Sequence, residues 1–592
     1  MLRKLYSLQS LLGLNTLLIV LGCVFSQQTC AELSIKGLDD EAETNVRTTL
    51  ALSKEACKTP EWKIRGLFDK ADADIDQALR ALGYYHAIVE KTLTIKSGCW
   101  LAEFRIQPGE RTIIQNIQIT LIGAASTDKN FNELRETLVA QKTQPLRHDF
   151  YESIKSKFNT LAQDQGYLSA QFIEKKLLID KENNGAEIIL TFDSGPRMRF
   201  GKLTVEQDIL RPGLVARFLD MKTGDYYSSE HIANTYNALS NSGYFDSIAI
   251  RPDLEHIVQQ HVPVTVQLKP KSKHHYGFGA GFDTDIGPLG SAAYSNRRIN
   301  RLGHLLNANM DLSPVLSTTD AEYVVPLKNP VFDAFSFGAG GKMEDTNTYR
   351  SATGKISARL KHLFRSGWKQ TLFLDYSYEN FDTGTTTGNT LVLAPGVSWL
   401  RSVSDNLLRP NRGYRVQMDL TGSYKALLSD VSFAQALLSA IYITPAPWSS
   451  GADNSTKQRS KWIARTELGA TWVDPFSRLP TTNRFYAGGI SSVRGYAYKE
   501  LGPKDSSGTV VGGTFLAVFS FEYEQAILDD WAVAAFIDTG NAFKYNTIEL
   551  KTGVGIGARW YSPIGPVRID VGLPMNESDS TFQIHFAAGA RL

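Results

Sequence analysis

The amino-acid sequence predicts a mixed fold, in which three βααββ domains precede a 16-stranded antiparallel transmembrane β-barrel. Three observations support this prediction: an apolar segment at the amino terminus, a pattern of helix, glycine and strand that occurs three times, and a long carboxyl-terminal region in which apolar and polar residues alternate. The expected boundaries are 1–31 for a signal peptide, 32–108, 109–196 and 197–271 for modules 1, 2 and 3, and 272–592 for the barrel.

The amino-terminal segment has the pattern of a secretory signal. Arg3 and Lys4 precede an apolar stretch at residues 11–25, and small residues follow it. We expect cleavage near Ser26 or Ala31. An uncleaved membrane anchor is the alternative, but about fifteen apolar residues are short for a transmembrane helix. The segment therefore predicts export across the inner membrane.

The three modules share a glycine between a helical pattern and a strand pattern, at Gly83, Gly166 and Gly243. Such a glycine is expected to end its helix in the left-handed conformation, and an aromatic residue follows it each time. Each module also opens and closes with a strand pattern, which predicts a small three-stranded sheet. The open edge of such a sheet suits pairing with an extended chain, while the alternative is a generic α+β fold without a binding role.

Two cysteines, Cys57 and Cys99, lie well inside module 1. In an oxidising compartment they are candidates for a disulfide bond. Two unpaired buried thiols are the alternative.

The carboxyl-terminal region has the pattern of a transmembrane barrel. In the run 514–523, aromatic residues occupy one face and Glu522 the other. A strand with one apolar and one charged face fits a barrel in lipid, or a sheet of a soluble sandwich. The extent of the region favours the barrel, because sixteen runs of about twenty residues, connections included, fit strands of about ten residues. The runs start near residues 276, 291, 303, 320, 333, 353, 367, 390, 412, 430, 459, 514, 531, 552, 566 and 581.

The first and last of these runs must close the barrel. In the first, Tyr276 and Phe278 are expected to face lipid, whereas Gly277, Gly279 and Gly281 leave the inner face bare and the backbone easily bent. The residues expected to face this strand from the last run are Phe582, Ile584 and Phe586.

One loop in this region, 484–496, carries an arginine between small residues. A guanidinium inside a narrow lumen requires carboxylate partners, and Glu522 and Asp538 are both expected to point inward. The sequence therefore predicts that Arg494 is held by carboxylates of the inner wall.

Three motifs in this region identify a family. The whole mature chain resembles polypeptide-transport-associated (POTRA) domains joined to the barrel of the outer-membrane protein assembly and translocation superfamily. Val493-Arg494-Gly495-Tyr496 is similar to the signature loop of that family, Phe536-Ile537-Asp538-Thr539-Gly540 to its signature inner-wall strand, and the segment 559–570 to the sequence that follows. The resemblance implies that Arg494 pairs with Asp538 and Glu522, and that the seam between the first and last strands opens sideways.

The resemblance also carries expectations about function. A barrel preceded by three modules is most similar to the barrel subunits of the translocation and assembly module. This similarity implies a TamB-like periplasm-spanning partner anchored in the inner membrane. Clients would be unfolded outer-membrane or autotransporter proteins, assembled in the outer membrane of a Gram-negative bacterium with the modules in the periplasm. A two-partner-secretion transporter and a passive pore are the alternatives. No enzyme motif, cofactor site or metal site is expected, and a net charge of +2 gives no reason to expect nucleic acid.

Overall fold

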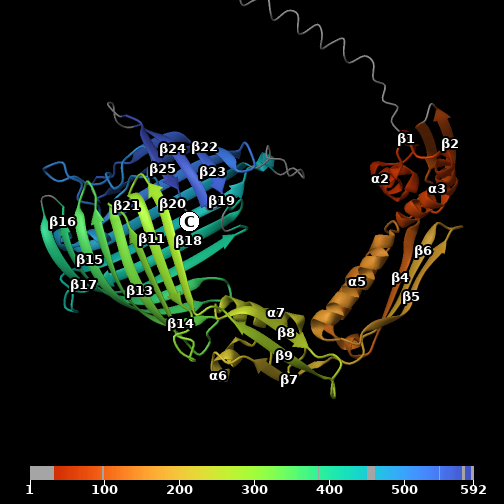
Figure 1. Cartoon of the computed structure of the whole chain (residues 1–592), viewed down its shortest axis with the longest axis horizontal. Helices are drawn as coiled ribbons and strands as arrows, with labels where there is room; N and C mark the ends of the chain where they lie inside the picture. Colours follow the sequence, from red (N-terminus) through yellow and green to blue (C-terminus); the bar gives the residue numbers. More distant parts are fainter. Residues whose placement is uncertain are drawn as a thin grey trace, which may run out of the picture. The chain divides into compact units, whose positions relative to one another are not determined.

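The computed structural model describes one closed barrel and three small sheets (Figure 1). The described residues are 32–588 without 97–98, 384–385, 407–408, 450–459, 546, 564 and 576–580. The predicted signal peptide, 1–31, lies outside them. Within this part of the chain, no helix combines the length and apolar content needed to cross a membrane.

Module 1 is a three-stranded sheet with two helices. Its elements are β1 (Glu32–Lys36), α2 (Asp40–Thr49), α3 (Glu61–Ala81), β2 (Ile88–Lys96) and β3 (Cys99–Gln107). The strand order is β1-β3-β2, so β3 lies in the centre and β2 forms an edge. The alternation of buried and exposed residues along β3 places Ala102, Phe104 and Ile106 in the core, because successive side chains of a strand point to opposite faces.

Modules 2 and 3 have the same order of elements and strands. The elements of module 2 are β4 (Ile113–Ile122), α4 (Lys129–Val139), α5 (His148–Gln165), β5 (Gln171–Asp180) and β6 (Gly185–Asp193). Those of module 3 are β7 (Arg199–Glu206), α6 (Pro212–Val215), α7 (Ser229–Asn241), β8 (Phe245–Pro252) and β9 (His261–Pro270). The predicted βααββ fold is confirmed.

The glycine after the main helix of each module is left-handed, as predicted. The φ angles of Gly83, Gly166 and Gly243 are +90°, +85° and +75°. The tyrosine that follows each glycine is buried, so it covers the end of the helix with apolar surface.

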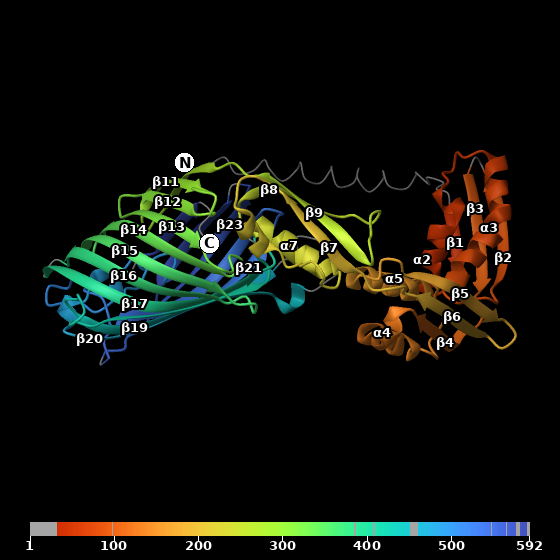
Figure 2. The same cartoon turned by 90° about the horizontal axis from the view of Figure 1, so that it is seen from below.

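The barrel consists of sixteen antiparallel strands, and in Figure 2 the green strands β13–β17 run side by side. Its first eight strands are β10 (His274–Asp283), β11 (Gly287–Asn296), β12 (Leu305–Leu312), β13 (Leu316–Pro326), β14 (Asp333–Asp345), β15 (Arg350–Leu363), β16 (Lys369–Asp382) and β17 (Thr387–Ser404). The other eight are β18 (Gly413–Ser423), β19 (Ser432–Pro445), β20 (Ser460–Asp474), β21 (Phe515–Ala526), β22 (Trp531–Phe543), β23 (Lys551–Ser562), β24 (Gly565–Pro574) and β25 (Gln583–Ala588).

The two faces of the barrel wall differ as the alternation predicts. Phe278, Phe337 and Ile556 are exposed on the outside, whereas Asp538 and Asp570 are fully buried. An apolar outer face and a charged lumen are the properties that allow a closed sheet to sit in a bilayer. The alternative of a soluble sandwich is therefore wrong.

Candidate functional site

The lumen holds a buried arginine from the loop between β20 and β21. The side chain of Arg494 is 1% exposed. Its Nε and Nη2 donate to the two carboxylate oxygens of Asp538 at 2.7 and 3.0 Å, and its Nη1 donates to Glu522 Oε2 at 2.6 Å. The guanidinium carbon lies 3.4 Å from the ring centroid of Phe536. Paired, charge-assisted hydrogen bonds and an aromatic face give this cation a specific site.

The register of β21 and β22 explains why these wall residues meet. Glu522 is the cross-strand partner of Phe536, and Ser520 is the partner of Asp538. Residues two apart on one strand share a face, so all four side chains point into the lumen. The sequence placed Glu522, Phe536 and Asp538 there, and the structure brings all three to Arg494.

A second arginine and a third carboxylate complete the group. Arg559, on β23, donates to Glu522 Oε1 at 2.9 Å and to Asp570 Oδ1 at 2.6 Å. Asp570 Oδ2 also accepts from Arg494 Nη1 at 3.3 Å. We call Arg494, Glu522, Asp538, Arg559 and Asp570 the lumen cluster.

The predicted group around Arg494 did not include Asp570, its third carboxylate, or Arg559, which binds Glu522 and Asp570. Both lie in the segment 559–570 that resembles the family. Because successive side chains of a strand point to opposite faces, the alternation of apolar residues in β23 and β24 predicts that both lie on the inner face. This inward position was the signal that could have added them to the cluster.

Two wall glycines allow the backbone of the loop to touch the wall. A Cβ atom at Gly553, on β23, would lie 1.8 Å from the carbonyl oxygen of Arg494. A Cβ at Gly572, on β24, would lie 2.5 Å from the backbone nitrogen of Gly495. Because real Cβ atoms do not approach other atoms so closely, the docked position of the loop depends on both glycines.

The loop is also fixed to other parts of the wall. Lys499 Nζ donates to Glu344 Oε1, at the end of β14, at 2.7 Å and to the Tyr349 hydroxyl at 2.6 Å. The backbone nitrogen of Thr481 donates to Glu379, on β16, at 2.8 Å. The loop therefore bridges strands that are far apart around the barrel.

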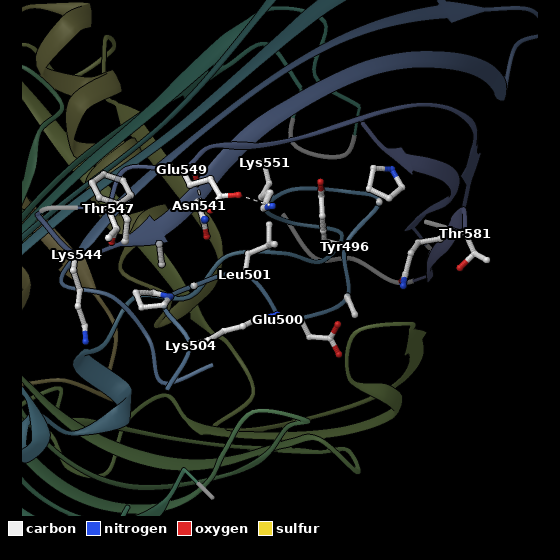
Figure 3. A pocket seen from close by; sticks show the side chains of 18 residues that line it. Tyr496, Glu500, Leu501, Lys504, Asn541, Lys544, Thr547, Glu549, Lys551 and Thr581 are labelled. Atoms are coloured by element: carbon white, nitrogen blue, oxygen red, sulfur yellow. Dashed lines mark hydrogen bonds and ion pairs between the residues drawn. The ribbon is translucent and has the colours of Figure 1, made fainter. Parts of the chain in front are cut away.

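A cavity of about 850 Å³ lies between the loop and the wall (Figure 3). Tyr496 and Glu500 line it from the loop, and Asn541 and Lys551 line it from β22 and β23. The ion pair of Lys551 with Glu549, 2.7 Å between Nζ and Oε1, belongs to the same lining. The lining is mostly polar, and among the described residues no group of three or more His, Cys, Asp or Glu could hold a metal ion.

Within the described residues, which end at Ala588, the seam between β10 and β25 has two register pairs. Phe282 and Asp283 face Ala588 and Ala587, whereas β10 and β11 are paired along the whole of β10. Tyr276, Gly277, Phe278, Gly279 and Gly281 have no register partner on the described part of β25. Of the residues expected from the last strand, Phe586 packs its ring on Phe282 at 5.8 Å, Ile584 pairs with Val571 of β24, and Phe582 precedes the strand.

The two cysteines of module 1 form a disulfide bond in the structure. Cys57 belongs to the segment before α3, and Cys99 is the first residue of β3. The bond therefore ties that segment to the central strand of the sheet.

Comparisons with known proteins agree with this architecture. Residues 343–592 match the model of the Omp85 superfamily domain, and residues 32–108 match the model of POTRA domain TamA domain 1. Outer membrane protein assembly factor BamA from Nitratidesulfovibrio vulgaris is 22% identical over 92% of this chain and 70% of the relative. BamA from Neisseria meningitidis is 21% identical over 79% of this chain and 74% of the relative.

A solved structure has the same fold. The crystal structure of BamA from Haemophilus ducreyi lacking POTRA domains 1–3 is similar with a TM-score of 0.64 at 17% identity, over 80% of this chain and 99% of that chain. Residues 343–592 therefore form an Omp85 superfamily domain and residues 32–108 a POTRA domain, and the protein is an outer-membrane protein with its POTRA domains in the periplasm.

Proposed function

We propose that this protein is the outer-membrane component of a protein translocation and assembly machine, and that the edge of β10 serves as a template for strands of its clients. The clients would be autotransporter-like proteins and other β-barrels. The observation that carries the proposal is the short pairing of β10 with β25, over two residue pairs in the described part of the seam.

The physical reason is the cost of an unpaired strand edge in lipid. Backbone N–H and C=O groups have no water to bind in the hydrocarbon core, so each unsatisfied group costs several kcal/mol. A client strand that pairs with β10 satisfies these groups, and β-strand addition supplies affinity through the backbone without requiring one sequence. Such a site can therefore serve clients that differ in sequence.

The loop between β20 and β21, residues 475–514, is the second part of the proposal, and we call it the lumen loop. Arg494, Gly495 and Tyr496 would lock the loop to the wall through Glu522, Phe536 and Asp538. The contacts of Arg494 with these side chains support this role, because they hold the loop against β21 and β22 of the barrel wall.

Within the superfamily, we propose that the chain is TamA-like and acts with a TamB-like protein that spans the periplasm from an inner-membrane anchor. The match of module 1 to the POTRA domain TamA domain 1 supports this assignment, as does the number of modules. The ranges 32–108, 109–196 and 197–271 are proposed as the POTRA boundaries. Co-purification of the full chain with such an inner-membrane protein, lost when module 1 is deleted, is the expected result.

A site-specific photocrosslinker tests the template directly. We expect a probe at Tyr276 or Phe278 to capture a radiolabelled client barrel during its assembly in cells. A probe at Phe337, which is also exposed on the outer face but lies on β14, is the matched control. Equal capture at Phe337 and Phe278 would contradict the proposed function.

A further inference from the structure

The lumen loop touches both strands of the seam. The backbone nitrogen of Ile490 donates to Asp285 Oδ2 at 2.9 Å, and Asp285 lies in the turn directly after β10. The backbone nitrogen of Gly495 donates to Nε2 of His585, on β25, at 3.0 Å. These two contacts flank Arg494 on either side along the loop, so one loop segment joins the first strand to the last.

The two wall residues also lie next to each other. The Nδ1 atom of His585 is 3.9 Å from Asp285 Oδ1, which is too long for a direct hydrogen bond but close enough for attraction. Because Nε2 accepts a hydrogen bond from the backbone N–H of Gly495, a neutral His585 carries its proton on Nδ1, the atom that faces Asp285. Both side chains are almost fully buried, so water does not compete for these contacts.

These contacts occur where the seam is paired. Phe282 and Asp283 are the paired residues of β10, and the next residue, Thr284, donates its backbone N–H to the Phe586 carbonyl at 2.9 Å. Asp285 and His585 therefore lie one residue beyond the last backbone contact of the seam. Their side chains therefore add contacts at the end of the described backbone pairing.

The sequence of the loop fits close contact with Asp285. A Cβ atom at Gly489 would lie 2.5 Å from Asp285 Oδ2, and the φ angle of Gly489 is +99°. A side chain at this position would push Asp285 away from the loop and strain the backbone.

We propose that Asp285 and His585 are positioning residues that couple docking of the lumen loop to closure of the seam. When Arg494 holds the loop in the lumen cluster, Ile490 and Gly495 hold the turn after β10 against β25. When the loop leaves, both contacts are lost and backbone pairing alone holds the seam. The use of this coupling in client assembly rests on the proposed function, whereas the coupling between loop and seam requires no client.

The test measures seam closure in the full-length protein in outer membranes without added client. Cysteines at the paired positions Phe282 and Ala588 form a disulfide when the seam is closed. We expect His585→Leu and Asp285→Ala to slow this oxidation about fivefold to tenfold, the change that loss of one net hydrogen bond produces. His585→Gln and Asp285→Asn keep an acceptor and are expected to stay within about twofold of the parent.

The same substitutions in an Arg494→Ala protein distinguish coupling through the loop from a direct effect of each substitution on the seam. With Arg494→Ala the loop is released, so we expect His585→Leu to change the oxidation rate by less than about twofold. Gly489→Ala, which keeps the identity of both wall residues but displaces Asp285 from the loop, is expected to slow oxidation as Asp285→Ala does. Heat-modifiable migration on a gel shows that each barrel is folded.

Two results would overturn the proposal: unchanged oxidation in the folded His585→Leu and Asp285→Ala variants, or equal slowing with and without Arg494. A seam that responds to these variants while probes on β10 capture no client would refute the template and leave the coupling intact. Capture of clients by β10 in a protein whose seam does not respond to these variants would refute the coupling and leave the template intact.

Discussion

Replacing Arg494 by alanine is the most informative change in the lumen cluster. Of its three carboxylates, Glu522 and Asp570 each keep a bond to Arg559. Asp538 keeps the backbone N–H of residue 494, 3.1 Å from its Oδ2, and Arg465, whose Nη2 lies 4.0 Å away; its side chain is fully buried. Asp538 therefore becomes a buried charge without a close cationic partner.

The size of the effect follows from this orphaned carboxylate. Removing one partner of a buried ion pair typically costs about 3–5 kcal/mol. If this energy acts on docking of the loop, the population of undocked loop rises by a factor of about 10² to 5 × 10³. The barrel itself is expected to form, because its backbone ladder does not involve Arg494.

The assay is limited proteolysis of the loop in intact cells, combined with heat-modifiable migration of the barrel. We expect faster cleavage within residues 484–513 for Arg494→Ala and no change for Arg478→Ala, an exposed arginine of the same loop. Arg494→Ala with Asp538→Asn is expected to recover part of the protection, since it removes the orphaned charge. A loop that is as resistant in Arg494→Ala as in the parent would refute this reasoning.

Three further predictions concern other parts of the chain. Gly553→Ala is expected to release the loop and raise its cleavage rate at least tenfold, because the new Cβ has no room beside the Arg494 carbonyl. Gly354→Ala, where a new Cβ meets no other atom, is the control. Equal cleavage of the two variants would contradict the close approach of the loop to Gly553. Cys57→Ser is expected to lower the free energy of unfolding of module 1 by about 4 kcal/mol, from loss of the crosslink over 42 residues, in denaturant melts followed by proteolysis; a loss under 1 kcal/mol would contradict it. Burial and a hydrogen bond to Asp128 raise the pKa of Tyr167 to about 12, above about 10 in an unfolded chain, so its contribution to the stability of module 2 is complete below pH 10 and is lost as pH rises to 12. Tyr167→Phe should remove this loss in pH-dependent melts, and an identical pH profile for the two proteins would refute it.

The fold could be predicted from the sequence because its signals are local. Alternation along each strand fixes which side chains face lipid, and every predicted strand start lies within a few residues of the observed one. The left-handed glycines of the modules were predictable for the same reason, since a helix end, a glycine and a buried aromatic residue are adjacent in the chain.

The lumen cluster was only partly predictable. Glu522 and Asp538 could be found because they interrupt apolar strands on the inner face. The contacts of Asp285 and His585 with the loop depend on how the barrel closes, which brings residues about 300 positions apart into contact. No local pattern marks such a pair.

A register scan between β10 and a client tests the central claim most directly. Cysteines are placed one at a time at positions 276–281 of this protein and at successive positions of the last strand of a client barrel, and disulfides are trapped during assembly. Backbone pairing predicts that moving the client cysteine by two residues moves the reactive position on β10 by two. Reaction at every position alike, or at none while assembly proceeds, would contradict the account.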